Sequence, residues 1–301
     1  MLAVLFLMAK SFFFTLHQQV AALAALRARP PGAAGRQAFV GFGDPWFAAS
    51  HAETQLAAAA LDTTALRGGQ RIRLRNAAAT VRLASAGLDA LPRLPETADE
   101  VRDIAVALKA DPDKDVFVGA AANERAAKTA LERRKVIAFA THGLVPGDLD
   151  GLTQPALALS APQIAGVEGD GLLTVDEILG LKLDADWVVL SACNTAAGDG
   201  AGAEAVSGLG RAFFYAGARA LLVSNWPVET TSARALTTAV FRRQAADPSL
   251  SRAEALRRTM LGLLDEGGLS DPASGKLVFS YAHPIFWAPF TLVGDGGGAT
   301  R

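Results

Sequence analysis

Two apolar strands, each running into a small polar motif, decide the fold of this chain: VIAFA at residues 136–140 leads into THG at 141–143, and WVVL at 187–190 leads into SACNT at 191–195. Short, continuous apolar runs are typical of strands that are buried on both faces of a parallel sheet. In such sheets, reactive groups lie beyond the carboxyl ends of the strands. If the two strands are neighbours, His142 and Cys193 therefore emerge side by side at one edge of the sheet.

Strand and helix signals alternate on both sides of these two strands. Further strands are predicted at Ala38–Gly41, closed by a turn at 41–45, and at Val116–Gly119, Ala156–Leu159, Ala220–Val223 and Phe290–Val293. Helices are predicted at Glu124–Arg134, Val206–Ala216, Thr231–Gln244 and Ser251–Glu266, and two more begin at capping-box spacings, Thr97 with Glu100 and Thr174 with Glu177. This alternation predicts an α/β fold with a mostly parallel central sheet and helices on both faces.

Composition excludes several classes of protein. The chain has 301 residues, 29 basic against 30 acidic side chains, four His and one Cys. A single Cys makes no internal disulfide and no Cys-rich metal cluster, so we expect no metal and no cofactor. A net charge of −1 argues against a nucleic-acid binder. The apolar N-terminal run is too short to span a membrane and has its Lys on the wrong side for a signal peptide, which favours a cytoplasmic protein.

The expected neighbours His142 and Cys193 have the chemistry of acyl transfer. An imidazole beside a thiol takes the thiol proton and later returns it to a leaving amine. The backbone N–H groups of Gly143 and Cys193 provide two donors for an oxyanion hole. Each residue alone is more often structural, because a lone Cys usually packs as a small hydrophobe. Asp44, Asp148, Asp150 or a backbone carbonyl could orient the imidazole.

Both motifs resemble those of the CHAT domain, a caspase-like module associated with tetratricopeptide repeats. Its signature is an apolar strand into a-T-H-G and another into S-A-C-x-T, which stand here at residues 140–143 and 191–195. Further stretches match in the same order: GFGDP at 41–45, LPET at 94–97, and the segments 172–178, 208–220, 224–228 (SNWPV) and 283–287 (HPIFW). The resemblance implies a caspase-like three-layer sandwich and a cysteine endopeptidase with a Cys193–His142 dyad.

The resemblance also implies a substrate site. Ser191, two residues before the Cys, would line the pocket for the side chain preceding the scissile bond, and Asp199 or Glu229 could add charge from nearby loops. Ser224, Asn225 and Trp226 would form the strand edge that pairs with the substrate backbone. Trp226 is equally well explained as a packing residue before Pro227.

Domain boundaries and partners follow from the extent of the resemblance. Residues 36–295 form the CHAT domain, 1–35 an N-terminal segment that could belong to a longer protein, and 296–301 a flexible tail. No repeat precedes the domain, so a sensor with tetratricopeptide repeats or another module is expected as a partner, beside a protein or peptide substrate. The alternative function is a catalytically silent CHAT-fold module that binds a partner protein.

Overall fold

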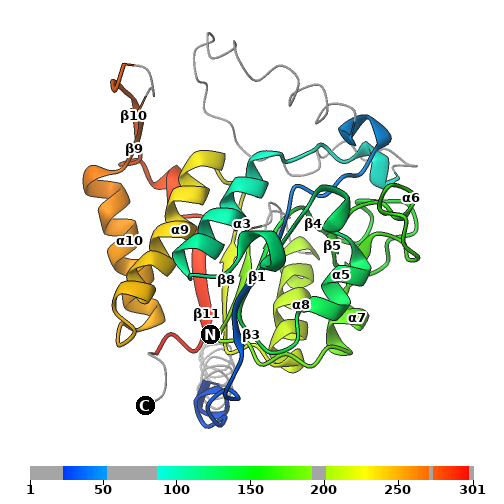
Figure 1. Cartoon of the computed structure of the whole chain (residues 1–301), viewed down its shortest axis with the longest axis horizontal. Coiled ribbons are helices and arrows are strands. Elements are labelled where there is room, and N and C mark those ends of the chain that lie inside the picture. The colour runs from blue at the N-terminus through cyan, green and yellow to red at the C-terminus, as the bar shows by residue number, and fades with distance from the viewer. Residues whose placement is uncertain (1–22, 53–86, 192–200, 271–273, 298–301) are drawn as a thin grey trace, which may run out of the picture.

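The computed structural model describes residues 23–52, 87–191, 201–270 and 274–297 (Figure 1). Within them, a six-stranded sheet has the strand order β11–β8–β7–β3–β1–β2. The strands are β1 (Gln37–Gly43), β2 (Val116–Val118), β3 (Arg134–Ala140), β7 (Trp187–Leu190), β8 (Ala220–Ser224) and β11 (Phe290–Gly294). β11 pairs antiparallel with β8, and every other pairing in this sheet is parallel. The predicted mostly parallel sheet is confirmed.

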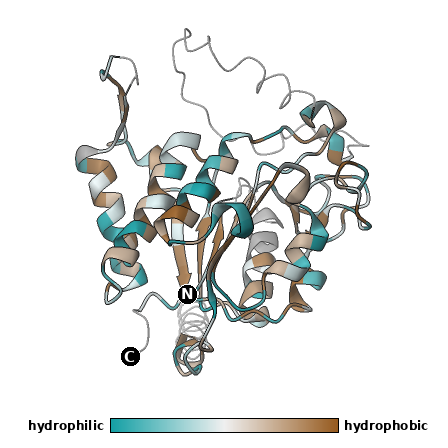
Figure 2. Cartoon of the chain, in the orientation of Figure 1, coloured by the Kyte–Doolittle hydropathy of each residue, from teal (hydrophilic) through white to brown (hydrophobic). Residues whose placement is uncertain are grey.

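Helices cover both faces of this sheet, which lies between them in Figure 1. One face carries α3 (Glu96–Ala107), α9 (Thr230–Ala246) and α10 (Arg252–Glu266), and the other carries α5 (Glu124–Ala130), α7 (Val175–Leu179) and α8 (Ala201–Ala216). Successive residues of β3 alternate between them, because Val136 and Ala138 pack with the first core and Ile137 and Phe139 with the second. Figure 2 shows the hydrophobic strands inside and hydrophilic residues on the outer sides of the helices. The architecture is the expected three-layer α/β/α sandwich.

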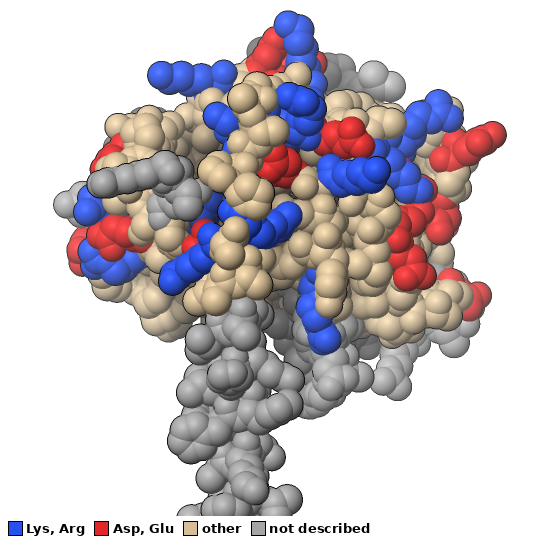
Figure 3. Space-filling model, turned by 90° about the horizontal axis from the view of Figure 1, so that it is seen from below, with Lys and Arg blue, Asp and Glu red and all other residues tan. Residues whose placement is uncertain are grey.

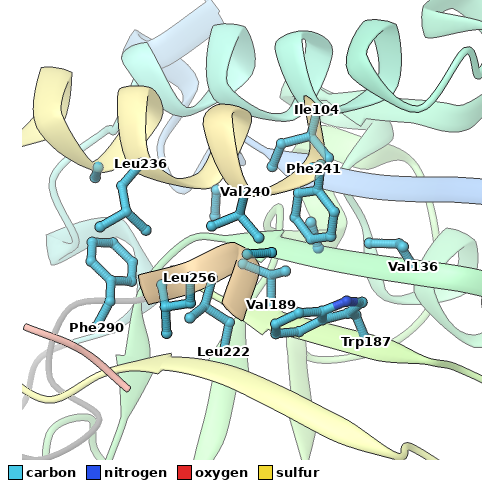
Figure 4. Packing of buried hydrophobic residues seen from close by; sticks show 14 of the residues in the cluster. Ile104, Val136, Trp187, Val189, Leu222, Leu236, Val240, Phe241, Leu256 and Phe290 are labelled. Atoms are coloured by element: carbon cyan, nitrogen blue, oxygen red, sulfur yellow. The ribbon is translucent and has the colours of Figure 1, made fainter. Parts of the chain in front are cut away.

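The first core is built around aromatic and branched side chains from the strands and from α3, α9 and α10 (Figure 4). Trp187 meets Phe241 of α9 edge-on, with ring centroids 5.8 Å apart and an interplanar angle of 74°. The indole N–H of Trp187 donates to the side-chain oxygen of Gln244 at 2.9 Å, so its one polar atom is satisfied. This packing fixes the start of β7, and with it the direction in which its carboxyl end leaves the sheet.

A small antiparallel sheet follows the carboxyl end of β3. It contains β4 (Gly143–Leu144), β5 (Ala156–Ala158) and β6 (Leu172–Thr174). Its apolar side chains form a third cluster with four buried residues from outside the three strands, Phe47, Leu91, Leu149 and Leu152. The chain segments after β1 and before α3 are thereby packed against the sheet that begins beside His142.

The remaining short elements connect these layers. They are α4 (Pro112–Asp115), α6 (Pro162–Ala165), the hairpin strands β9 (Gly268–Ser270) and β10 (Leu277–Ser280), and the single 3-10 turns η1 (Leu88–Ala90), η2 (Gly119–Ala121) and η3 (Pro284–Phe286).

The capping box predicted at Thr97 and Glu100 is wrong. Helix α3 begins earlier, with Pro95 as its N-cap and no side-chain cap. The Thr97 hydroxyl instead accepts from the backbone N–H of Asp44 and donates to the carbonyl of Leu94, each at 2.7 Å. Tertiary hydrogen bonding therefore replaces the local cap. The box at Thr174 and Glu177 is confirmed, with both reciprocal bonds formed.

Two predicted element ends are also corrected. Helix α5 stops at Ala130 rather than at Arg134, because Arg134 already pairs with Gln37 as the first residue of β3. Strand β1 continues through the supposed turn to Gly43. Its glycines allow α3 to approach, since a Cβ on Gly43 would lie 2.6 Å from the carbonyl oxygen of Thr97.

Two further observations concern the charges on the surface and the length and apolarity of the helices. In the face shown in Figure 3, basic and acidic side chains are intermixed rather than separated into a stripe of one sign. Among the described residues, no helix has the length and apolarity that crossing a membrane requires.

Candidate active site

His142 is fully buried just beyond the carboxyl end of β3. Its Nε2 atom lies 2.7 Å from the carbonyl oxygen of Pro92, in the segment that leads into α3. A carbonyl oxygen only accepts, so Nε2 carries the proton in this hydrogen bond, and the lone pair of the neutral ring is on Nδ1. The Phe47 ring packs against the imidazole with centroids 5.6 Å apart. The imidazole is therefore held by a hydrogen bond at Nε2 and by contact with an aromatic ring.

The residues on either side of His142 tie it to the small sheet. The Thr141 hydroxyl donates to the carbonyl of Ala158 at 2.6 Å, and the backbone N–H of Ala158 donates to the carbonyl of His142 at 2.9 Å. Gly143 is opposite Leu157 in the antiparallel register. Because bonded and non-bonded pairs alternate along such a ladder, the Gly143 N–H points away from β5. That direction suits the oxyanion donor expected from the sequence.

Strand β7 lies directly beside β3, as the sequence requires for a site shared by the two motifs. Phe139 is opposite Leu190, and the backbone N–H of Ser191 donates to the carbonyl of Phe139 at 3.0 Å. Ser191 is buried at the end of β7. Cys193 follows two residues later in the sequence and lies outside the described residues, as does Asp199. The roles of Cys193 and His142 as a dyad therefore stay a prediction.

Two of the three aspartates considered as orienting groups for His142 bind other residues. Asp44 binds Arg93, and Asp148 accepts from the backbone N–H of Val145 at 2.8 Å. The alternative of a backbone carbonyl, here that of Pro92, is what the structure places on the imidazole.

The residues expected to bind substrate lie at the end of β8. Ser224 is buried and paired with Phe290 of β11, so it is inside the sheet rather than at a free edge. Asn225 donates through its backbone N–H and its side-chain amide to the carbonyl of Pro289, at 2.8 and 3.0 Å. Trp226 is 40% exposed. Ser224 and the backbone N–H of Asn225 are therefore already engaged by neighbouring residues, and pairing of this edge with a substrate stays a prediction.

Glu229 is committed to helix structure. Its carboxylate is the N-cap of α9 and accepts from the backbone N–H groups of Thr231 and Ser232. It is 2% exposed, which leaves it poorly suited to supply charge to a substrate pocket.

Sequence reasoning missed Pro92 and Arg93 as parts of this site. Pro92 contributes through a backbone carbonyl, which leaves no side-chain signature, and the contact joins residues 50 positions apart. Arg93 next to it forms an ion pair with Asp44 across 49 positions. An Arg between two prolines before a helix is a signal for a fixed turn, but the sequence carries no indication of its partner. The described residues contain no cluster of His, Cys, Asp or Glu that could hold a metal ion.

The sandwich and the site together define an α/β protein of caspase-like architecture, with a buried histidine at the carboxyl edge of its central sheet. The chain belongs to the CHAT domain family, a caspase-like, peptidase-related family, because the model of the CHAT domain matches residues 6–295. The resemblance drawn from the two motifs is thereby confirmed.

A curated relative links the chain to repeat proteins. It is 32% identical over 126 residues to mouse (Mus musculus) tetratricopeptide repeat protein 28, a match that covers 41% of this chain and 4% of the mouse protein. The similarity therefore concerns a small part of a much longer protein.

Proposed function

We propose that this chain is a caspase-like cysteine endopeptidase in which Cys193 is the nucleophile and His142 is the general base and acid. The observation that carries the proposal is the hydrogen bond from His142 Nε2 to the Pro92 carbonyl at 2.7 Å. It leaves the Nδ1 lone pair as the basic site of a neutral imidazole. That imidazole follows β3, and the strand beside it, β7, continues in the sequence to Cys193.

The reaction begins when the Cys193 thiol transfers its proton to Nδ1 of His142. The thiolate sulfur bonds to the carbonyl carbon of the scissile amide, and the carbonyl electron pair moves to oxygen, where the N–H groups of Gly143 and Cys193 stabilise the charge. The imidazolium then protonates the leaving amine as the C–N bond breaks, which leaves a thioester. Water gives a proton to Nδ1 and attacks the thioester, and the C–S bond breaks as the proton returns to sulfur.

The substrate of this reaction is a protein or peptide bound in an extended conformation. Asn225 and Trp226 would pair with its backbone, and Ser191 would line the pocket for the side chain before the cut. Ser191 is small, neutral and buried, which disfavours an Arg or Lys in that pocket. Activation by a tetratricopeptide-repeat partner completes the proposal, and the family and the name of the mouse relative support that association. We further propose that the protein acts in the cytoplasm.

Labelling of the single Cys tests the dyad. A thiol-directed alkylator reacts only at Cys193, so intact-mass spectrometry reports its rate without ambiguity. We expect rapid labelling at neutral pH, slow labelling in His142→Ala, and no change in His283→Ala, which removes a histidine whose Nδ1 caps η3. Equal rates in wild type and His142→Ala would contradict the dyad.

Mapping of newly formed protein N-termini in a lysate tests the activity itself. Wild type should produce cleavages that Cys193→Ala does not. A labelled, His142-dependent Cys193 with no difference between the two proteomes would instead favour the silent binding module.

A further inference from the structure

We infer that the Asp44–Arg93 ion pair is a positioning device for His142, which fixes the Pro92 carbonyl and so selects the tautomer of the imidazole. The inference deepens the proposed function, on which its catalytic consequence rests. Arg93 is the residue directly after Pro92, whose carbonyl oxygen lies 2.7 Å from His142 Nε2. Both residues of the ion pair act through this backbone carbonyl.

The ion pair is short, bidentate and largely shielded from water. Arg93 Nε donates to Asp44 Oδ1 at 2.8 Å, and Arg93 Nη2 donates to Asp44 Oδ2 at 2.6 Å. The two side chains are 12% and 7% exposed. Two parallel bonds between planar groups fix orientation as well as distance. Because Arg93 directly follows Pro92, the same bonds restrict where the Pro92 carbonyl can point.

Asp44 is also hydrogen-bonded through its backbone to the segment that follows Arg93. The backbone N–H of Asp44 donates to the Thr97 hydroxyl, which donates in turn to the carbonyl of Leu94. Asp44 has a φ of 46°, in the left-handed region that Asp tolerates better than most residues. Its side chain thus binds Arg93, and its backbone binds the segment that directly follows Arg93.

The segment after Asp44 also contacts the imidazole and the guanidinium. The Phe47 ring packs against the His142 ring at an interplanar angle of 50°, and the Phe47 backbone N–H donates to His51 Nδ1 at 3.2 Å. The guanidinium carbon of Arg93 lies 5.8 Å from the centre of the Trp46 ring. The stretch that follows β1 therefore contacts the imidazole directly through Phe47 and holds the residue next to Pro92 through the Asp44–Arg93 ion pair.

The sheet register brings these groups to one place. β1 and β3 are parallel neighbours, and Gly43 is opposite Ala140. Asp44 follows Gly43, and His142 follows Ala140 by two residues, so the ion pair and the imidazole share the carboxyl edge of the sheet. Removing two charges from water costs free energy, which often offsets what their attraction contributes to the stability of the fold. We therefore assign this ion pair the role of orienting the Pro92 carbonyl.

NMR of the imidazole nitrogens in the Cys193→Ala background tests the positioning without any chemistry at the thiol. Wild-type His142 should be the Nε2–H tautomer. Arg93→Met keeps an extended side chain but lacks the guanidinium group that binds Asp44. In this variant, His142 should be a mixture of the Nε2–H and Nδ1–H tautomers. Asp44→Asn should have the same effect with less risk to folding, because Asn also tolerates a positive φ.

Arg134→Met is the matched control. Arg134 and Asp115 form a comparable ion pair at 2.5 Å, with side chains 11% and 17% exposed, at the opposite end of β3. Its loss should leave the His142 tautomer unchanged. If Arg93→Met and Asp44→Asn also leave the tautomer as in this control, the inference is overturned.

The rate of Cys193 alkylation as a function of pH supplies a second readout. It is measured in protein that retains Cys193. Arg93→Met should slow labelling at neutral pH by roughly tenfold or more, since small misplacements of reacting groups are costly. Arg93→Lys, which keeps the charge without the fork, should lie between Arg93→Met and wild type. If the labelling rate does not depend on His142, the proposed function fails. The NMR measurement of the His142 tautomer then still tests whether the ion pair positions the imidazole.

Discussion

Phe42 and Phe139 occupy facing positions of β1 and β3, and their rings stack with centroids 5.2 Å apart at an interplanar angle of 16°. Phe117 of β2 stacks on the other side of Phe42 at 5.0 Å. A continuous aromatic row thus crosses three strands on the face covered by α5, α7 and α8. Phe139, the member of this row in β3, is three residues before His142. The row therefore links the site to the second core.

Phe42→Ala should lower the free energy of unfolding by about 3–5 kcal/mol, because the side chain is fully buried and its removal leaves a cavity between two rings. Urea denaturation followed by circular dichroism measures the change. Tyr215→Ala removes a ring that is 81% exposed and should change stability by no more than about 0.5 kcal/mol. Similar losses in both variants would mean that the aromatic row does not stabilise the sheet.

The layers of the fold could be predicted because their signals are local. VIAFA and WVVL are short apolar runs, and the two strands they form proved to be parallel neighbours. The box at Thr174 needs only two residues three positions apart. Each of these patterns lies within one turn or one strand, so all of its parts are visible in a short stretch of sequence.

The groups around His142 could not be predicted, because distant segments supply them. Thr97 has the spacing of a capping box, but its hydroxyl serves Asp44 from another element. Asp44 was a candidate for orienting the imidazole, and its carboxylate binds Arg93 instead. The Pro92 carbonyl has no side chain to mark it. In each case a tertiary partner, absent from the local pattern, outcompetes the local one.

Thr174→Ala tests the confirmed capping box. The Thr174 hydroxyl accepts from the Glu177 N–H, and Glu177 accepts in return from the Thr174 N–H at 2.8 Å. We expect a loss of about 1 kcal/mol in thermal or chemical unfolding. Thr129→Ala is the control, since its exposed hydroxyl bonds only within α5 and Ala favours a helix. A Thr174→Ala variant as stable as the control would contradict the role of the cap.

Asp186→Asn tests a cluster of charges at the start of β7. Asp186 lies within 4 Å of three arginines, Arg36 at 3.1 Å, Arg219 at 3.5 Å and Arg252 at 3.9 Å. All three guanidinium side chains are at most 10% exposed, and burial lowers the pKa of Arg252. Removal of the shared negative charge should cost about 1–3 kcal/mol, because the arginines stay buried with less compensation.

Asp99→Asn is the surface counterpart of this change. Asp99 is 54% exposed and pairs with Arg102 and Arg234 at the surface. Exposed pairs are screened by water, so its loss should cost no more than about 0.5 kcal/mol in the same unfolding measurement. Equal losses of stability in Asp186→Asn and Asp99→Asn would mean that burial of the Asp186 cluster does not increase its contribution to stability.

His51 should make the stability of the fold depend on pH. Burial first, and then the neighbouring Arg93, lower the pKa of His51 below 6.5, against an opposing contribution from Asp44. The unfolded chain therefore takes up a proton at a higher pH than the folded chain, and stability falls as the pH drops from about 6.5 through the folded pKa. Protonation also removes the Nδ1 lone pair that accepts from the Phe47 N–H. His51→Asn keeps an acceptor at that position and removes the titration, so its melting temperature should vary less with pH across this window. An NMR titration of His51 that gave a midpoint at or above 6.5 would contradict this explanation, because the folded state would then have no deficit of bound protons at this residue.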